Sequence, residues 1–332
     1  MPYFKRTSIR DIAEAAGVST TLVSFVLNGK ANQYRINEET ARRIVEIAKE
    51  MNYNPNIAAK SLRNGRSKII GVVVSDISNP FFASIARLFE DEAAKYGYTV
   101  FFGSSDERAD KMEHIIKNLM NRGVDGLVVV PCENTKDFIS SLVLRDVSIV
   151  LLDRYFPGIK ISSVALNNYE TTYKATQHLL KFGYNSPGIV AYDVQLIHMQ
   201  DRIKGYESCM RDAGYEQKIR TMRIAQGSPI ESAGSIVTQA LKQGVDSFIF
   251  ATNLISLSCL YAIKDLGPSL TDRIGLIGFD GNPAFDFFSR PISYIQQPVS
   301  ALVQKSLQLL MENMENQETQ SILLDGQLVV KL

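Results

Sequence analysis

The chain has 332 residues, of which 45% are hydrophobic and 21% are charged, as in a globular protein of two or three domains. Its three cysteines show no CxxC or Cys/His spacing, which argues against a structural zinc site and a disulfide scaffold. The first residues are polar and charged, and no apolar run approaches the length of a membrane span. We therefore expect a cytoplasmic, nucleoid-associated protein with no membrane partner.

The net charge of +1 hides an uneven distribution along the chain. Residues 1–68 contain 12 Lys+Arg and 6 Asp+Glu, a net charge of +6, whereas the remainder carries 24 and 29, a net charge of −5. A small basic head on a larger acidic body indicates a module that binds nucleic-acid phosphates, attached to a domain with another task. Chance unevenness is the weaker alternative for an excess of this size.

Residues 8–28 predict two short helices joined by a tight turn. Ser8 can cap the first helix, with Asp11 as its capping-box partner, and Ser19 can cap the second. Gly17 lies where the chain must reverse, and glycine adopts positive φ without strain. This pattern is typical of a helix-turn-helix, whose second helix enters the DNA major groove; an ordinary αα-hairpin is the alternative.

The outer face of the second helix carries Thr20, Thr21, Ser24 and Phe25. A phenyl ring cannot form a hydrogen bond with a base edge, but it can pack on a thymine methyl group. We therefore predict a thymine under Phe25, with the two threonines providing the polar contacts to bases. If Phe25 instead turns into the core of the head, the helix reads bases through three short side chains.

After a third helix over 35–51, residues 54–65 predict a short fourth one. A helix of about two turns is marginal in water alone and needs a surface to fold against. Leu62, with Lys60 and Arg63 beside it, suits minor-groove insertion, in which an apolar wedge opens a base step while cations hold phosphates. A linker helix resting on the body is an equally good interpretation of these residues.

From residue 67 onward the pattern changes to alternating strands and helices, which predicts doubly wound parallel sheets in two similar α/β lobes. The expected strands are 69–74, 98–102, 126–130, 148–152, 188–192, 219–224, 247–251 and 274–279. The expected helices are 80–95, 107–122, 134–144, 200–213, 230–243 and 255–266. A further strand at 293–297 and a helix at 300–316 could return to the first lobe.

The predicted domains are a helix-turn-helix domain over 1–53, a hinge helix and linker over 54–68, and a two-lobed body over 69–332. We assign about 69–166 and 292–318 to the first lobe, and about 167–291 and 319–332 to the second. Ligands of such sheets bind in the crevice at the carboxyl ends of the strands.

The body shows no GxGxxG, P-loop, HExxH or GxSxG motif, and its three histidines lie on different expected elements, so we predict no enzyme, metal site or cofactor. Polar and aromatic side chains do recur where strands end. A carboxylate can accept from adjacent hydroxyls, an arginine can donate as a fork, and a ring can stack on a sugar. The predicted small-molecule site comprises Asp76, Phe81, Phe82, Asp153, Arg154, His198, Arg202, Asn253 and Asp280.

The chain resembles the LacI/GalR family of bacterial transcription regulators from about residue 7 to residue 330. The motifs that carry the resemblance are Ile12-Ala13-x-x-Ala16-Gly17-Val18-Ser19-Thr20-Thr21, Val26-Leu27-Asn28-Gly29, Tyr53-x-Pro55-Asn56, Asn79-Pro80-Phe81-Phe82, Arg202-x-x-Gly205-Tyr206 and Gly278-Phe279-Asp280. The resemblance implies a homodimer that binds a near-palindromic operator and a body similar to periplasmic sugar-binding proteins.

The resemblance also implies roles for individual residues. Leu62 matches the position at which the family's hinge helix wedges into the minor groove, and Phe82, Arg202 and Asp280 match positions that contact effectors. Phe25, Leu254 and Asn167 depart from residues common in the family. The predicted DNA-binding set is Ser8, Ser19, Thr20, Thr21, Ser24, Phe25, Asn28, Tyr53, Asn56, Ala59, Leu62 and Arg63.

These observations favour a transcription regulator, most simply a repressor of carbohydrate-metabolism genes, controlled by a sugar or sugar derivative between the lobes. A solute-binding protein that serves a transporter would explain the body but not the basic head. A sugar-processing enzyme lacks a recognisable nucleophile or metal grouping.

Overall fold

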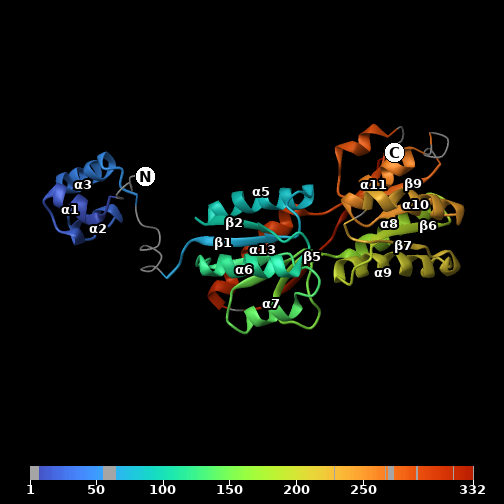
Figure 1. Ribbon diagram of the computed structural model, residues 1–332, viewed down its shortest axis with the longest axis horizontal. Coiled ribbons are helices and arrows are strands. Elements are labelled where there is room, and N and C mark those ends of the chain that lie inside the picture. Colours follow the sequence, from blue (N-terminus) through green and yellow to red (C-terminus); the bar gives the residue numbers. More distant parts are fainter. Residues whose placement is uncertain are drawn as a thin grey trace. The chain divides into compact units, whose positions relative to one another are not determined.

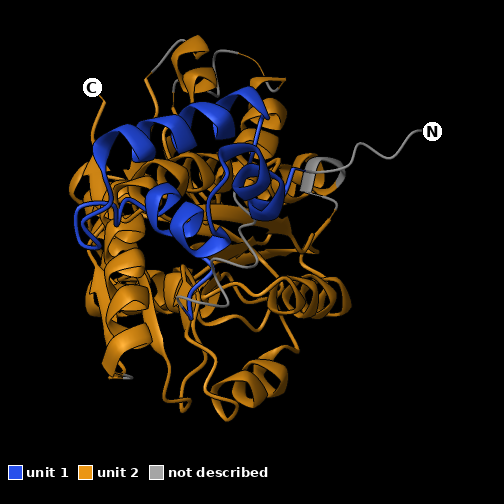
Figure 2. Cartoon of the chain, turned by 90° about the vertical axis from the view of Figure 1, so that its left-hand side faces the viewer, with its two compact units in different colours: residues 1–67 blue, residues 68–332 orange. Residues whose placement is uncertain are grey.

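The structure is a computed structural model that describes residues 7–54, 65–227, 229–265, 267, 273–288, 291–316 and 318–331. The chain divides between Ser67 and Lys68 into two compact units, coloured separately in Figure 2. The core of the predicted hinge helix, residues 55–64, lies outside the described residues. Among the helices that are described, none has the length and apolar character needed to cross a membrane.

The described part of unit 1 contains three helices, α1 (Ile9–Ala16), α2 (Thr20–Leu27) and α3 (Glu38–Glu50). The predicted capping box is present, because Ser8 accepts from the Asp11 amide while the Asp11 carboxylate accepts from the Ser8 amide. Ser19 caps α2 and Gly17 takes the left-handed conformation at the turn, with φ of +64°. One apolar core, centred on the fully buried side chains of Ile12, Val23 and Ile44, joins the three helices.

Unit 2 contains two six-stranded sheets, shown with their helices in Figure 1. The first has the order β11-β5-β4-β3-β1-β2, with all strands parallel. Its strands are β1 (Ile69–Val74), β2 (Thr99–Ser104), β3 (Gly126–Val129), β4 (Ile149–Leu152), β5 (Ser162–Leu166) and β11 (Ser321–Leu324).

The second sheet has the order β12-β10-β9-β8-β6-β7, in which only β12 is antiparallel to its neighbour. Its strands are β6 (Pro187–Tyr192), β7 (Thr221–Ile224), β8 (Ser247–Phe250), β9 (Gly275–Phe279), β10 (Ser293–Gln296) and β12 (Gln327–Val329). The fold class predicted from the sequence is therefore confirmed, with mainly parallel sheets in both lobes.

Helices cover both faces of each sheet, because the side chains of a strand alternate between its two faces. In the first lobe, α5 (Pro80–Lys95) and α13 (Val299–Asn316) pack on the face that carries Ile70 and Val72, and α6 (Ala109–Asn121) and α7 (Lys136–Val143) pack on the face of Val73. In the second lobe, α8 (Asn168–Lys181) and α9 (Ile197–Asp212) oppose α10 (Pro229–Lys242) and α11 (Asn253–Lys264). The described part of the second lobe also contains two short 3₁₀ helices, η1 (Glu216–Lys218) and η2 (Pro283–Phe287).

The predicted assignment of the C-terminal segments to lobes was wrong for two strands. β10 had been placed in the first lobe, but it pairs with β9, as Ile295 opposite Phe279 shows. β11 had been placed in the second lobe, but it pairs with β5 in the first. The chain therefore crosses between lobes three times: after β5, after β10 and between β11 and β12. A lone apolar strand does not reveal its partner, because pairing depends on residues distant in sequence.

Candidate functional site

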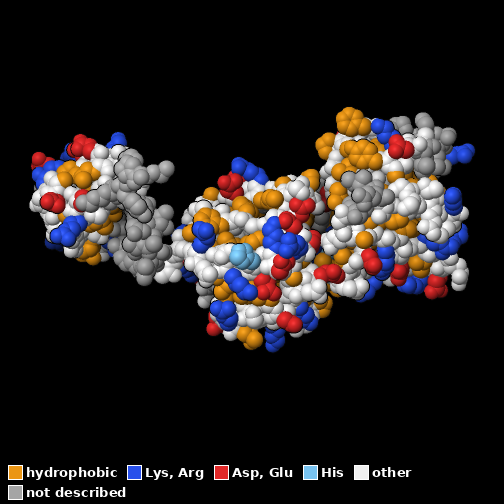
Figure 3. Space-filling model, viewed as in Figure 1, with side chains coloured by type: hydrophobic (Ala, Val, Ile, Leu, Met, Phe, Trp, Pro, Cys, Tyr) orange, Lys and Arg blue, Asp and Glu red, His pale blue; other side chains and the backbone are white. Residues whose placement is uncertain are grey.

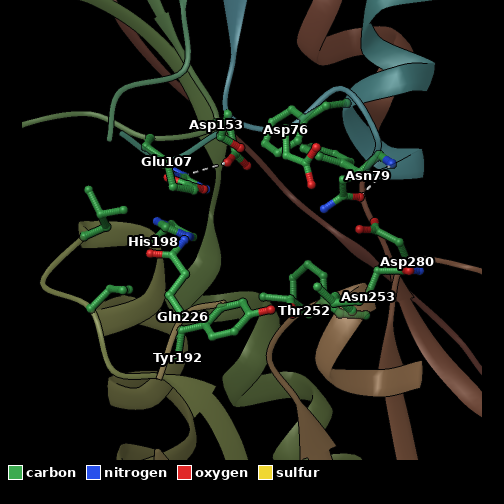
Figure 4. A pocket seen from close by; sticks show the side chains of 18 of the residues that line it. Asp76, Asn79, Glu107, Asp153, Tyr192, His198, Gln226, Thr252, Asn253 and Asp280 are labelled. Atoms are coloured by element: carbon green, nitrogen blue, oxygen red, sulfur yellow. Dashed lines mark hydrogen bonds and ion pairs between the residues drawn. The ribbon is translucent and has the colours of Figure 1, made fainter. Parts of the chain in front are cut away.

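A cavity of about 550 Å³ lies between the two lobes, at the carboxyl ends of their strands. All nine residues of the predicted small-molecule site line this cavity. Figure 4 shows Asp76, Glu107 and Asp153 of the first lobe facing Tyr192, Gln226 and Thr252 of the second. Parallel strands bring these residues together, because their carboxyl ends meet at one edge of each sheet.

Several polar residues of the cavity wall were not among the predicted site residues. These are Ser75, Asp106, Glu107, Tyr192, Gln226, Thr252 and Gln297, whereas Asn79, which lines the cavity too, had been noted beside Phe81 and Phe82 after the first strand. Asp106 and Glu107 follow β2, and Gln297 follows β10, so the same strand-end rule would have found these three, and it also covers Ser75 after β1 and Thr252 after β8. Gln226 follows β7 at the same spacing as Asp106 follows β2, so the rule would have found it as well.

An ion-pair network of Glu107, Arg154 and Asp153 forms part of the first-lobe wall. The Arg154 guanidinium donates two hydrogen bonds to Glu107, at 2.6 and 2.7 Å, and a third to the Pro131 carbonyl at 3.2 Å. Arg154 Nε also lies 3.4 Å from a carboxylate oxygen of Asp153. Burial alone would lower the pKa of Arg154, but the Glu107 carboxylate reverses this and raises it. Arg154 therefore stays charged and is held by groups of its own lobe.

Asp153 itself occupies an unusual backbone position. It follows β4 directly, its φ is +66°, and its amide donates to the Val164 carbonyl of β5 at 2.9 Å. Aspartate and asparagine tolerate this left-handed region better than most residues. Burial raises the pKa of Asp153, and the neighbouring Arg154 opposes that shift.

Arg202 of α9 supplies the second guanidinium. Its Nε donates to Asn168 Oδ1 at 2.7 Å, Nη1 donates to the Ala251 carbonyl, and its guanidinium carbon lies 3.7 Å from the centre of the Phe279 ring. Burial lowers the pKa of Arg202 to about 10, which leaves it charged near neutral pH. The α8–α9 contact that allows this geometry needs Gly205, because a Cβ there would lie 2.2 Å from the Tyr169 carbonyl oxygen.

Asp280 lies at the corresponding strand end of the second lobe. It follows β9, its φ is +59°, and its amide donates to the Ile295 carbonyl at 2.7 Å. Asp280 Oδ2 accepts from Gln297 Nε2 at 3.1 Å. The two remaining oxygens of this pair, Asp280 Oδ1 and Gln297 Oε1, are buried and have no hydrogen-bond partner among the described residues. Burial raises the pKa of Asp280 to about 6.

Neutral and aromatic groups complete the cavity. His198 is 5% exposed, and burial lowers its pKa well below the ordinary value, so the imidazole is uncharged near neutral pH. The rings of Phe81 and Phe82 meet edge to face with centroids 4.9 Å apart. Carboxylate and amide acceptors beside aromatic faces suit a ligand with several hydroxyl groups. In the part of the chain that the structure describes, no group of three or more His, Cys, Asp or Glu could hold a metal ion.

In unit 1, the predicted reading helix exposes Thr20 and Thr21 in its first turn. Ser19 accepts from the Leu22 amide, and Asn28 donates to the Ser24 carbonyl, so both side chains take part in capping α2. Ser8 is likewise engaged in its capping box. The two threonines are thus exposed polar side chains of the predicted base-reading face, whereas Ser8, Ser19 and Asn28 take part in capping.

Phe25 neither joins the core of unit 1 nor stands free. Its ring stacks on Tyr34, with centroids 3.8 Å apart and planes 8° from parallel, and Tyr34 is 47% exposed. Tyr53, another predicted DNA contact, is half-buried and packs against the core. Asn56, Ala59, Leu62 and Arg63 lie outside the described residues, so their predicted roles remain predictions.

Comparison with known proteins identifies both units. Residues 8–56 match the family model described as bacterial regulatory proteins, lacI family. Residues 67–329 match the model described as periplasmic binding proteins and sugar binding domain of LacI family. The chain belongs to the LacI family. The resemblance seen in the sequence motifs is therefore confirmed, and this LacI-family protein is a DNA-binding transcription regulator with a small-molecule effector domain.

Individual relatives agree with this assignment. The ribose operon repressor of Halalkalibacterium halodurans is 30% identical over 93% of this chain and 91% of its own length. The HTH-type transcriptional regulator DegA of Bacillus subtilis is 29% identical over 90% of this chain and 88% of its own. A structure of the lac repressor dimer bound to operator and the anti-inducer ONPF has a TM-score of 0.85 at 22% identity and covers 98% of both chains. This last likeness concerns the fold.

Proposed function

We propose that this LacI-family protein represses genes of carbohydrate metabolism, and that a sugar or sugar derivative bound between the lobes controls its affinity for operator DNA. The observation that carries the proposal is the pair of buried, unpartnered oxygens on Asp280 and Gln297, because leaving a buried polar group without a partner costs free energy that a ligand hydroxyl would recover. A related ribose operon repressor points to the same class of effector.

Gln297 connects the cavity with one of the segments that join the two lobes. It immediately follows β10, on the second of the three crossings between lobes, and it donates to Asp280. The first and third crossings are linked as well, since Asn167 Nδ2 donates to Asp325 Oδ1 at 3.2 Å. A ligand that contacts both lobes and Gln297 would favour one arrangement of these crossings. By thermodynamic linkage, operator DNA would then alter effector affinity by the same factor.

We further propose a homodimer on a near-palindromic operator, as in the lac repressor dimer. Tyr261 of α11 is 66% exposed, and Phe287 of η2 is 88% exposed. Figure 3 shows hydrophobic side chains gathered at the top of the second lobe, on the right of the view. In the first lobe, the edge strand β2 exposes Phe101 and Phe102 by 37% and 39%. Exposed apolar groups of this size are typical of protein interfaces.

The direct test is a gel shift with genomic fragments, with and without a small library of sugars. We expect specific fragments to be retained and a sugar to change their affinity, in a direction that the same gel reveals. A solute-binding protein or a sugar-processing enzyme would retain no fragment specifically.

In the same assay, Leu62→Ala should weaken binding to the specific fragment much more than binding to random DNA. Equal losses would contradict the wedge role predicted for Leu62.

A further inference from the structure

The charges around the cavity restrict the effector beyond the class of sugars. The lining includes five carboxylates but only two guanidinium groups, and no lysine occurs among the described lining residues. The carboxylates are Asp76, Asp106, Glu107, Asp153 and Asp280. We propose that the effector carries no negative charge and is a neutral sugar or polyol, not a sugar phosphate or another anion. This inference rests on the proposed function, and it concerns the same cavity.

Arg154 is one of the two cations with which an anionic ligand could pair, but its guanidinium is already hydrogen-bonded to the Glu107 carboxylate. Glu107 accepts two hydrogen bonds from the guanidinium in the forked geometry that a ligand carboxylate or phosphate would otherwise adopt. The side chains of Arg154 and Glu107 are 7% and 19% exposed, so water screens this ion pair only weakly. An anion at Arg154 would have to displace Glu107 and leave that carboxylate without its partner.

Arg202 is the second cation, and it lies in the field of two carboxylates. Asp153 and Asp280 both act to raise its pKa, which means that both stabilise its charge. Its Nε and Nη1 donate to the Asn168 side chain and the Ala251 carbonyl, and its face covers the Phe279 ring. His198 adds no positive charge, because burial keeps its imidazole neutral.

Four residues of the cavity wall carry a buried polar atom without a hydrogen-bond partner among the described residues: Arg154 Nε, His198 Nδ1, Asp280 Oδ1 and Gln297 Oε1. Arg154 Nε lies 3.4 Å from the Asp153 carboxylate, and the two oxygens are hydrogen-bond acceptors. Asp280 Oδ1 and Gln297 Oε1 each need a proton donor, which a sugar hydroxyl supplies. A phosphate monoester carries a charge of about −1.5 to −2 at pH 7 and offers mainly acceptor oxygens. A phosphate beside Asp280 would therefore add like-charge repulsion without satisfying either oxygen. The open acceptors beside Asp280 and the carboxylates around both guanidinium groups therefore select in the same direction.

The test compares matched pairs of ligands on the full-length protein. The pairs are ribose with ribose 5-phosphate, fructose with fructose 1-phosphate, and glucose with glucose 6-phosphate. Thermal melting identifies any pair with a binding member, and isothermal titration calorimetry gives both dissociation constants at pH 7.5. We expect the neutral member to bind at least about tenfold more tightly, since like-charge juxtaposition is strongly unfavourable. Equal or tighter binding of the phosphate, or no binding by any neutral sugar, would overturn the inference.

Glu107→Gln tests the cause, because it should release Arg154 for an external anion. We expect this variant to reduce the preference for the neutral member by about tenfold or more. Asp110→Asn is the matched control: it removes an exposed carboxylate of the same segment that is paired with Arg108 and does not line the cavity, and it should change the preference less than about threefold. Equal changes in the two variants would contradict the role of Glu107. If Glu107→Gln does not fold, the wild-type pairs decide the proposal alone.

The proposed function can fail separately. Tighter binding of a phosphate would overturn the neutral effector and leave a sugar-responsive regulator in place. A gel shift in which no genomic fragment is specifically retained would overturn the proposed function, whichever sugar binds.

Discussion

Asp153 and Asp280 occupy equivalent places in the two lobes and have different surroundings. Each directly follows a central strand, each has a positive φ, and each donates its amide to the neighbouring strand. Asp153 lies beside Arg154, which is also bound by Glu107 in the same lobe. Asp280 leaves one buried oxygen without a partner among the described residues. An aspartate that follows an apolar strand can thus be paired within its own lobe, as Asp153 is, or keep an oxygen available for a ligand, as Asp280 does.

The largest expected effect comes from removing the charge of the open aspartate. Asp280→Asn preserves shape and tolerates the positive φ, but it loses the charged acceptor. We expect effector affinity to fall about 10- to 100-fold, the range for a hydrogen bond to a charged group, with operator affinity in the absence of effector retained. Calorimetry and gel shift measure the two quantities.

Asp153→Asn is the matched control for this comparison, because it makes the same change at the equivalent strand end. We expect it to reduce effector affinity much less than Asp280→Asn does, since Arg154 keeps its paired hydrogen bonds to Glu107. Equal losses in the two variants would mean that both aspartates serve the ligand alike.

Glu107→Gln should also lower the free energy of unfolding. Removing one partner of a buried ion pair leaves an uncompensated charge, which typically costs 3–5 kcal/mol. Because the Glu107 side chain is 19% exposed, we expect a smaller loss, about 2 kcal/mol in the free energy of unfolding measured by urea denaturation. The exposed neighbour offers a control, and Asp106→Asn should change that free energy by less than about 0.5 kcal/mol. A negligible effect of Glu107→Gln would show that the network does not hold the first-lobe wall.

Acid pH should weaken effector binding through Asp280. Its folded pKa of about 6 exceeds the ordinary aspartate value, so the carboxylate takes up a proton as the pH falls through 6. The protonated form is a poorer acceptor for a ligand hydroxyl, and affinity should therefore fall by up to about tenfold between pH 7 and pH 5. Calorimetric titrations across this range measure the loss. Asp280→Asn should remove most of the pH dependence, and an unchanged profile in that variant would assign it to another group.

The smallest effect concerns unit 1, where the reading helix shows a similar contrast between engaged and open groups. Tyr34 covers one face of the Phe25 ring, whereas Thr20 and Thr21 are exposed. We expect Tyr34→Ala to weaken operator binding about threefold by freeing the Phe25 ring, which is within the range of one aromatic pair. Selection of operator sequences by wild type and Phe25→Ala checks the predicted thymine. A guanine required at that position and lost in Phe25→Ala would contradict it.

Local signals made much of this architecture predictable. Ser8 and Ser19 predicted where α1 and α2 begin, and Gly17 predicted where α1 ends, because capping depends on residues close to the helix end. The continuous apolar runs at β1 and β4 likewise predicted buried parallel strands. Since parallel strands align their carboxyl ends, the residues after them could be placed together at one cavity.

Other features had no local signal in the sequence, either because a buried helix face is polar or because the feature depends on residues distant in sequence. The helix α8 was missed, because its buried face carries Asn168, Thr172 and Thr176 where an apolar stripe is the usual signal. The lobe of β10 depends on its pairing with β9, which no local pattern specifies. The role of Glu107 arises only when β2 and β4 bring it to Arg154, 47 residues away in sequence. Sequence reasoning located the strand-end aspartates but could not tell which one the fold had already engaged.

The most direct test of the account is a gel-shift titration of one specific genomic fragment with wild type and Asp280→Asn, with and without the neutral sugar that stabilises the wild-type protein. We predict that the sugar changes the fragment's affinity for wild type, and that Asp280→Asn binds the fragment normally but shows no change with the sugar at the same concentration. A full response of Asp280→Asn, or a wild type whose fragment affinity no bound sugar alters, would contradict the coupling of this cavity to DNA binding.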